Sequence, residues 1–303
     1  MKMVENSDLD NDQDIYLIAG ATGKTGVHIT KALVARGKIV RIIVRSATRA
    51  KTLLADVFDK LESVVTCDIV NDNDYGEKLK KALESSKGKV VSHVISTLSY
   101  NWDKTISPYD GNVTSNERLI DACVKSKIVK KFVFLSSSHV RRPWSYVSLT
   151  CNIIKPELNW HKVIAEDLVR KSGINYLIVR PVGLSKNIDL KETGYTIDQG
   201  DRVEGMIHRS TVGRLIVDTM LDPNIPDNTS YECISYAQDF QKEYSYTNGG
   251  FKLRCETEEE KQKVDHIIPK KVVLLSIFMA ISFTFYMVGK FISNKRIFQR
   301  FFK

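Results

Sequence analysis

A glycine-rich turn near the beginning of the chain has the residue types and spacing that bind phosphate groups. Glycine stands at every third position of the run GATGKTG, at Gly20, Gly23 and Gly26. Between a strand and a helix, the first glycine permits a tight bend, the second lets the backbone approach a pyrophosphate, and the third lets the helix pack on the strand. The free amide groups and positive dipole end of the helix would then face the phosphates. The run therefore predicts dinucleotide binding; a tight turn without a ligand is the alternative.

The flanking residues provide the strand and the helix that such a turn requires. Residues 15–19 are a short apolar run typical of a buried strand, and residues 24–36 carry apolar side chains at helical spacing. The sequence Gly23-Lys24-Thr25 also matches the end of a mononucleotide-binding P-loop. That motif needs glycine five places before Gly23, where this chain has Ile18. A P-loop is therefore excluded.

Two arginines after the second apolar run, residues 39–44, indicate which dinucleotide binds. A site for NAD usually carries Asp or Glu about 20 residues beyond the glycine turn, where the carboxylate binds the ribose hydroxyls. This chain has Arg45 there, followed by Ser46 and Arg49. Because guanidinium groups pair with the 2′-phosphate of NADP, we expect NADP(H), with NAD as the less favoured coenzyme. The alternative is a pair of solvated arginines on a surface loop.

Strands and helices are expected to alternate along most of the chain. Short apolar runs predict strands at residues 15–19, 39–44, 64–68, 90–96, 131–135 and 176–179, and amphipathic spacing predicts helices at residues 24–36, 48–57, 78–86, 116–125 and 157–171. Such alternation produces parallel strands joined by right-handed crossovers. The predicted fold class is α/β, a Rossmann-type doubly wound parallel sheet followed by a single C-terminal transmembrane helix.

Composition and charge narrow the classes of function. Of the 303 residues, 43% are hydrophobic and 27% are charged, which is typical of a globular protein. The net charge is +9, but seven basic residues and no acidic ones lie between Lys270 and Lys303, so residues 1–269 carry only +2. We therefore expect no nucleic-acid partner. The five cysteines are odd in number without a C-x-x-C, and the histidines form no cluster, so neither disulfides nor a metal site is expected.

An uncharged apolar stretch near the C-terminus predicts a membrane anchor. Residues 272–289, with the sequence VVLLSIFMAISFTFYMVG, contain no charge and are flanked by Lys270-Lys271 and Lys290. Spanning a bilayer takes roughly 17–25 such residues, and flanking lysines reach the lipid headgroups. A lipid bilayer is therefore the expected partner of residues 271–290. A buried C-terminal helix and an interfacial helix are the alternatives.

The expected organisation has five parts, of which one is a large domain. They are an acidic flexible N-terminus at residues 1–13, an NAD(P)-binding Rossmann domain at 14–236, a polar linker at 237–270, the transmembrane helix at 271–290 and a basic tail at 291–303. Because no N-terminal signal precedes the domain, we expect a tail-anchored protein whose domain faces the cytosol. The larger number of basic residues after the span favours the opposite orientation. A short span with a basic tail favours the mitochondrial outer membrane or endoplasmic reticulum, with a plastid envelope as the alternative.

Several segments together resemble one protein family. The chain resembles the atypical short-chain dehydrogenase/reductase superfamily, specifically its NAD(P)-binding group of NmrA-like, biliverdin reductase B-like and Tic62-like proteins. The matching segments are GATGKTG at 20–26, VRIIVRSATRA at 40–50, VVTCD at 64–68, KKFVFLSSS at 130–138, AEDLVRKSGINYLIVRPVGL at 165–184 and a late stretch at 207–223. The similarity covers about residues 14–236 and is specific to the group, but not to one enzyme within it.

The resemblance implies which residues contact the coenzyme. It places Gly20, Thr22, Gly23, Lys24, Thr25 and Gly26 at the pyrophosphate, Arg45 and Arg49 at the 2′-phosphate, Asp68 and Ile69 near the adenine, Ser96, Thr97 and Leu98 along the nicotinamide ribose, and Pro181, Val182 and Gly183 beside the nicotinamide.

The resemblance also implies two catalytic residues, Ser137 and Lys162, with one departure from the family pattern. Active members use a serine to hold the carbonyl, a tyrosine to donate the proton and a lysine that lowers the pKa of the tyrosine and binds ribose. The tyrosine of Y-x-x-x-K would stand at position 158, where this chain has Leu158. The candidate substitutes are Tyr146, His139 and His161. A structural role for Ser137, and a solvated helix face for Lys162, remain the alternatives.

Without the tyrosine, the expected activity shifts toward acceptors that take their proton from water. We expect a membrane-anchored NADP(H)-binding oxidoreductase that acts on a flavin, a quinone or another hydrophobic acceptor, with binding and orientation supplying most of the rate. The alternative is a weakly active or inactive NADP(H)-binding protein, a redox sensor or assembly scaffold of a membrane protein complex. Leu158 favours the scaffold, whereas Ser137 and Lys162 favour the enzyme.

Overall fold

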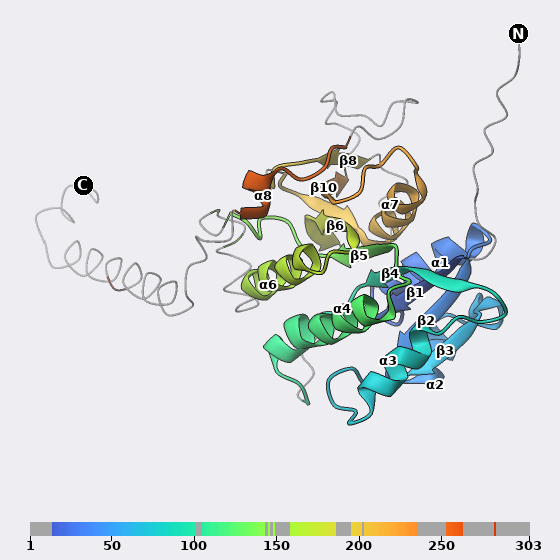
Figure 1. The fold of residues 1–303 in the computed structure, drawn as a ribbon. Coiled ribbons are helices and arrows are strands. Elements are labelled where there is room, and N and C mark those ends of the chain that lie inside the picture. Colours follow the sequence, from blue (N-terminus) through green and yellow to red (C-terminus); the bar gives the residue numbers. More distant parts are fainter. Residues whose placement is uncertain are drawn as a thin grey trace, which may run out of the picture. The chain divides into compact units, whose positions relative to one another are not determined.

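A sheet of eight strands organises the part of the chain that the computed structural model describes (Figure 1). The described residues are 14–100, 105–142, 145, 148, 158–185, 195–201, 203–235, 253–262 and 282. The strands are β1 (Asp14–Ala19), β2 (Ile39–Val44), β3 (Ser63–Thr66), β4 (Val90–Ser96), β5 (Lys131–Leu135), β6 (Asn175–Pro181), β8 (Tyr195–Asp198) and β10 (Thr229–Ser235). A separate pair consists of β7 (Gly183–Ser185) and β9 (Met206–His208).

The strand order reverses its direction between β1 and β4. The order is β3-β2-β1-β4-β5-β6-β10-β8, and every neighbouring pair is parallel except β10 with β8. The chain therefore winds outward in one direction from β1 and in the other direction from β4. In such sheets, ligands bind at the carboxyl ends of the strands where the winding reverses. The glycine-rich turn follows β1 at this point, and Thr97 and Leu98 follow β4.

Helices cover both faces of the sheet. They are α1 (Gly26–Ala35), α2 (Ala47–Leu53), α3 (Tyr75–Leu83), α4 (Ser115–Ser126), α6 (Leu158–Lys171), α7 (Arg209–Leu221) and α8 (Glu258–Gln262). Helices α1 and α7 pack together on one face, while α3, α4 and α6 lie in a row on the other (Figure 1). Alternate side chains of β1 separate the same way: Ile18 joins the core under α1 and α7, and Leu17 joins the core under α3, α4 and α6.

The predicted Rossmann-type α/β sheet is confirmed, and the bounds of several elements match the sequence prediction. Strands at 39–44, 90–96 and 131–135 have the predicted limits. The helix expected at 78–86 instead spans Tyr75–Leu83. It begins directly after Asp74, and its buried face consists of Leu79, Ala82 and Leu83. The antiparallel edge strand β8 was not predicted.

Part of the segment predicted as a polar linker packs on the domain. Leu253 contacts the core on the α1 side, the Glu256 amide donates to the Asn228 carbonyl at 2.8 Å, and the Glu256 side chain is fully buried. Residues 253–262 therefore belong to the folded domain, although the apolar periodicity fades after residue 236. The Glu256 carboxylate pairs with the buried Arg170, a contact that no local sequence pattern reveals.

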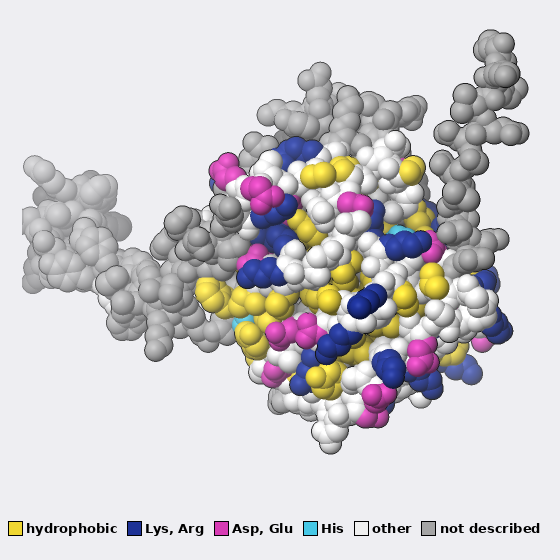
Figure 2. Space-filling model, in the orientation of Figure 1, with side chains coloured by type: hydrophobic (Ala, Val, Ile, Leu, Met, Phe, Trp, Pro, Cys, Tyr) yellow, Lys and Arg dark blue, Asp and Glu magenta, His cyan; other side chains and the backbone are white. Residues whose placement is uncertain are grey.

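The predicted membrane span lies, apart from Ser282, outside the described residues. The N-terminal residues 1–13 and the tail 291–303 lie outside them as well. Within the described ranges, no helix has both the length and the apolar character needed to cross a bilayer. On the face of the molecule shown in Figure 2, basic and acidic side chains are interspersed rather than gathered into one basic patch.

Candidate functional site

The glycine-rich turn between β1 and α1 has a backbone that only glycine fits. Gly20 has a φ of +87°, and a Cβ on it would lie 2.5 Å from Thr97 Oγ1. A Cβ on Gly26 would collide with the Gly20 carbonyl, while Gly23 donates to the same carbonyl at 2.8 Å. The first and third glycines therefore serve the fold of the turn. Gly23 is exposed, so its backbone is the part of the turn that a ligand can approach.

The amino end of α1 is suited to an anion. Its first turn contains no acidic residue, so nothing on the helix competes for its positive dipole end. Lys24 is exposed, Thr22 is half-buried, and Thr25, the residue that begins the helix, is buried. A backbone that excludes side-chain carbons, next to an unopposed helix terminus and a lysine, fits a pyrophosphate.

Thr97 has a structural role in the turn. Its hydroxyl lies 3.0 Å from the Gly20 carbonyl and 3.2 Å from the Ala19 carbonyl, and its amide donates to Ala19 at 3.0 Å. These contacts fasten the loop after β4 to the loop after β1, so the backbone of Thr97 lies beside the glycine turn. The threonine therefore holds the two loops together at the position where the resemblance expects the nicotinamide ribose.

Arg45 and Arg49 lie at the carboxyl end of β2, beside the glycine turn in the sheet order. Both side chains are exposed. Ser46 begins α2, and its hydroxyl accepts the Arg49 amide at 3.2 Å, which fixes the spacing between the two arginines along the first turn of α2. Two guanidinium groups at this edge fit the 2′-phosphate of NADP.

Asp68 shapes the loop after β3 with its carboxylate. Its Oδ1 atom accepts the amides of Val70 and Asn71 at 3.0 and 3.1 Å. The adjacent Ile69 is buried at 5% exposure, and the Arg118 guanidinium donates to its carbonyl at 2.8 Å. The two residues that the resemblance places near the adenine therefore form a fixed turn and a buried apolar contact.

A network of asparagines that sequence analysis missed holds the loop after β4. Ser96, which is fully buried, donates to Asn116 Oδ1 at 2.5 Å. Asn112 Oδ1 accepts the Ser99 hydroxyl at 2.8 Å and the Tyr100 amide at 3.0 Å. Asn112 lies in a π-helical turn, Asp110–Thr114, that widens the start of α4. Such turns often mark functional sites, but polar residues within a helical pattern give no signal of this kind in a sequence.

Lys162 brings a buried ammonium group to the carboxyl ends of β4 and β5. Its side chain is only 5% exposed, so the alternative of a solvated helix face is excluded. The Nζ atom donates to the Leu135 carbonyl at 2.9 Å and to the Leu98 carbonyl at 3.4 Å, and lies 4.8 Å from the centre of the Phe134 ring. The positive charge is thus fixed beside Leu98, which the resemblance places along the nicotinamide ribose.

The three serines after β5 differ in their surroundings. Ser136 is buried and donates to Glu166 Oε1 at 2.7 Å. Ser138 is buried, and its amide donates to the Pro181 carbonyl at 3.0 Å. Ser137, between them, is half-buried, and its hydroxyl has no hydrogen-bond partner among the described residues. Because Ser136 and Ser138 are buried, the Ser137 hydroxyl is the most accessible of the three to a substrate.

Two of the three candidate substitutes for the missing tyrosine lie among the described residues. Leu158, at the tyrosine position, begins α6. His161 is buried and its ring meets that of Tyr109 edge-on at 5.5 Å. His139 is also buried, and burial lowers the pKa of its imidazole, which favours the neutral form. Tyr146 lies outside the described residues.

Pro181 and Val182 form the end of β6 and the residue beyond it. Both are buried, and Val182 belongs to the apolar core under α1 and α7. Its amide donates to the Cys233 carbonyl at 3.2 Å. The next residue, Gly183, is exposed and pairs with β9 through its amide and the Gly205 carbonyl at 3.1 Å. Gly183 is therefore the accessible residue of this trio.

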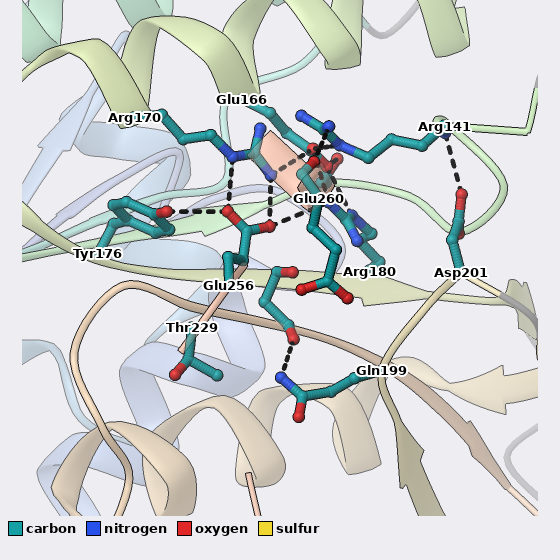
Figure 3. A network of polar contacts seen from close by, with 12 residues as sticks. Arg141, Glu166, Arg170, Tyr176, Arg180, Gln199, Asp201, Thr229, Glu256 and Glu260 are labelled. Carbon is teal, nitrogen blue, oxygen red and sulfur yellow. Dashed lines mark hydrogen bonds and ion pairs between the residues drawn. The ribbon is translucent and has the colours of Figure 1, made fainter. Parts of the chain in front are cut away.

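A buried cluster of charged side chains, which includes Glu166, Arg170 and Arg180, is drawn in Figure 3. Its Glu166 accepts a hydrogen bond from Ser136. Glu166 is fully buried and pairs with both Nε and Nη2 of Arg180 at 2.9 Å. Burial alone would raise the pKa of Glu166, but Arg180 and Arg170 hold it well below the usual range. Burial raises the pKa of Glu232, a second partner of Arg180, to about 7. Sequence reasoning missed this cluster because its members come from three separate elements, α6, β6 and β10.

Comparisons with known proteins agree on a family and a fold. A family model described as NAD(P)H-binding matches residues 20–223. A chloroplast protein of Arabidopsis thaliana that is named as uncharacterized is 31% identical over 215 residues, which are 67% of this chain and 71% of that protein. The chloroplast protein TIC 62 of the same plant is 29% identical over 197 residues, which are 60% of this chain but only 29% of that protein.

A solved structure supports the same fold. A short-chain dehydrogenase/reductase from Veillonella parvula, in complex with NADP, aligns with a TM-score of 0.56 at 16% identity, covering 73% of this chain and 94% of that one. The alignment therefore includes nearly the whole of that enzyme. Within the described residues of this chain, no group of three or more His, Cys, Asp or Glu side chains is arranged to hold a metal ion.

Proposed function

This chain belongs to the NAD(P)H-binding family, in the atypical short-chain dehydrogenase/reductase group, and we propose that it is a membrane-anchored reductase that uses NADPH. The acceptor would be a flavin, a quinone or another hydrophobic ring system. The observation that carries the proposal is the buried ammonium group of Lys162 at the carboxyl ends of β4 and β5, where it donates to the Leu135 and Leu98 carbonyls. A lysine is rarely buried to this extent for a structural role alone.

The preference for NADPH over NADH rests on the end of β2. Arg45 and Arg49 are exposed there, and no carboxylate stands at this position to bind the ribose hydroxyls of NAD. The phosphates would lie against Gly23, Lys24 and the amino end of α1. The neighbour from Veillonella parvula, whose structure contains NADP, supports this coenzyme without distinguishing it from NAD in this chain.

The chain's own residues would bind and orient rather than donate a proton. When bound, the reduced nicotinamide supplies a hydride to the acceptor. Lys162 would hold the nicotinamide ribose and stabilise negative charge that develops on the acceptor, and the Ser137 hydroxyl would donate a hydrogen bond to an acceptor oxygen. Because Leu158 provides no acid, the acceptor must take its proton from water, as a reduced flavin or quinone does. Orientation then supplies most of the rate.

The names of the relatives bear on location. Two of the relatives that match this chain are named as chloroplast proteins. They favour a plastid envelope over the mitochondrial outer membrane and endoplasmic reticulum, which the sequence analysis ranked first. We propose that residues 271–290 anchor the protein to such a membrane, with the domain on the cytosolic side. The apolar sequence of that segment and its flanking lysines support the anchor.

A second candidate function is a scaffold that binds NADPH without turnover. It is favoured by Leu158, which removes the usual proton donor. In this case the coenzyme would act as a signal of redox state for a membrane protein complex. The chain spans less than a third of TIC 62, so a role held by that whole protein does not transfer to this chain.

Steady-state oxidation of NADPH with a panel of flavins and quinones tests the two candidates, alongside a titration of NADPH binding. The reductase proposal expects turnover that falls at least about tenfold in Lys162→Met, because a buried charge at the site is removed. The matched control is Lys171→Met, an exposed lysine of the same helix, which should retain full activity. Binding without turnover, unchanged in Lys162→Met, would select the scaffold instead.

A further inference from the structure

The C-terminal segment, residues 253–262, lies outside the family match at 20–223 but contributes Glu256 to the buried cluster of Glu166, Arg170 and Arg180 (Figure 3). Its Glu256 carboxylate is fully buried and accepts two hydrogen bonds from Arg170, from Nε and Nη2, both at 2.6 Å. The Tyr176 hydroxyl donates to the same carboxylate at 2.8 Å. Charge-assisted hydrogen bonds of this length are the strong ones in proteins.

A second contact joins the C-terminal segment to the loop after β5. Arg141 Nη1 donates to the Glu260 carbonyl, and the same guanidinium lies 3.2 Å from Glu166 and 3.3 Å from Asp167. Arg141 is therefore held from two sides, by α6 and by the C-terminal segment. Its side chain is only 5% exposed, so water does not replace these partners.

The serine loop, residues 136–141, is fixed by this cluster along its length. At one end, Ser136 donates to Glu166. At the other end, the Asp201 carboxylate accepts the amides of both His139 and Arg141. His139 has a φ of +59°, a conformation that non-glycine residues keep only when their surroundings enforce it. Ser137 lies between the fixed ends, so its position depends on the same contacts.

We propose that Glu256 is a positioning residue of the site: through Arg170 and Glu166 it fixes the serine loop and so orients Ser137 toward the acceptor. Arg170 donates to both Glu256 and Glu166, and Glu166 also serves Ser136, Arg141 and Arg180. In a variant without the charge of Glu256, Arg170 and Arg180 lose one of the buried carboxylates that they contact. Glu166 then meets a larger excess of positive charge and holds Ser136 less firmly.

The orientation of the acceptor rests on the proposed reductase function, but the fixing of the loop does not. Hydrogen exchange of the full chain, followed by mass spectrometry, therefore tests the loop without any assay of activity. In Glu256→Gln we expect the amides of residues 136–141 to exchange roughly tenfold faster or more, as the loss of a charge-assisted hydrogen bond predicts for a local opening. Exchange in β4 should stay unchanged, which excludes general unfolding.

Two further variants make the test specific. Glu258→Gln is the matched control, because Glu258 belongs to the same segment, is 79% exposed and pairs only with Lys261 among the described residues. It should leave exchange in the serine loop unchanged. Arg170→Gln removes the side chain that links Glu256 to Glu166, and should loosen the serine loop even if Glu256→Gln proves too unstable to study.

The possible results of these experiments distinguish the positioning role of Glu256 from the proposed reductase function. Faster exchange confined to residues 253–262 in Glu256→Gln, with the serine loop unchanged, would overturn the positioning role. If Glu256→Gln is too unstable to study, an unchanged serine loop in Arg170→Gln would overturn it. If the wild-type chain reduces an acceptor, Glu256→Gln should raise the KM for that acceptor or lower kcat while the Kd for NADPH stays unchanged. If the wild-type chain shows no turnover, the reductase proposal fails and the exchange result still decides the role of Glu256.

Discussion

The buried ammonium group of Lys162 sets the electrostatics of the candidate site. Its three hydrogens face an interior bounded by the Leu135 and Leu98 carbonyls and the Phe134 ring. The two carbonyl oxygens and the ring face each present partial negative charge to the cation. The ammonium charge is thus fixed at the carboxyl ends of β4 and β5, where the proposed reductase would use it.

Arg45 should decide between the two dinucleotides. In Arg45→Glu, a carboxylate replaces the guanidinium that would pair with the 2′-phosphate, so we expect the Kd for NADPH to rise by about tenfold to a hundredfold, as for a lost charge-assisted pair. The Kd for NADH should fall or stay the same, because the carboxylate can bind the ribose hydroxyls. Fluorescence titration of both coenzymes measures this. Equal weakening of both, or tighter binding of NADH by the wild-type chain, would contradict NADPH as the coenzyme.

An ion pair between Arg41 and Glu62 connects β2 with the residue before β3 and makes the stability of the fold depend on pH. Arg41, on β2, is 4% exposed and forms a two-point contact with the Glu62 carboxylate at 2.7 and 3.0 Å. The same guanidinium donates to the Ala82 carbonyl at the end of α3 at 2.7 Å. One side chain thus connects β2, the residue before β3 and the end of α3.

Acid should weaken this connection. Hydrogen bonding to Arg41 lowers the pKa of Glu62 from 4.5 to about 2. A carboxyl whose pKa is lower in the folded state stabilises the fold above its unfolded pKa and loses that effect as the pH falls from about 4.5 toward 2. Glu62→Gln should therefore reduce the free energy of unfolding at pH 7 by about 1–2 kcal/mol and flatten its fall between pH 5 and 2. Urea denaturation across this range measures both effects.

The exposed Glu77 of α3 provides the control for this measurement. Glu77→Gln should leave the pH profile of stability as steep as in the wild-type chain. A Glu62→Gln profile that stays equally steep would show that other carboxylates, and not Glu62, carry the acid sensitivity.

Elements with a local signal were predictable from the sequence, and those that depend on distant partners were not. Strands at 39–44 and 131–135 are continuous apolar runs because both faces of a parallel strand are buried. The glycine turn also has a local cause, since the collision at Gly26 involves a residue six positions away. In contrast, Glu256 lies in a cluster of acidic residues that resembles a solvated linker, and its partner Arg170 is 86 positions away.

The residues of the candidate site also divide into those with a local sequence signal and those that depend on distant contacts. Lys162 was predictable because its spacing from position 158 follows the family pattern, but its burial follows from the packing of α6. Asn112 and Asn116 were missed because an amphipathic helix also carries asparagines on its solvated face. Their function depends on the π-helical turn, which aims Asn112 at the loop after β4. A sequence pattern with a period of 3.6 does not show such a turn.

At the scale of the whole molecule, the chain consists of two units that differ in composition and net charge. Contacts divide the chain into a unit that ends at Val264 and a second unit at Asp265–Lys303. The first contains the sheet and the candidate site, while the sequence of the second is apolar between basic ends. The net charge of +9 therefore arises largely from the second unit, where anionic lipid would attract each basic residue by roughly 1 kcal/mol near the surface.

Alkaline carbonate extraction tests whether the second unit anchors the protein. Full-length chain expressed in cells should remain with the membrane pellet, because an apolar span is held by lipid and not by charge. A chain that ends at Val264 should move to the supernatant and still bind NADPH, since it keeps all of the described contacts of the site. The double variant Ala280→Lys with Ile281→Lys should also be released, because each charge near the centre of a span opposes insertion by about 2.5–3.5 kcal/mol. Release of the unmodified full-length chain by carbonate would show that residues 271–290 do not span the bilayer.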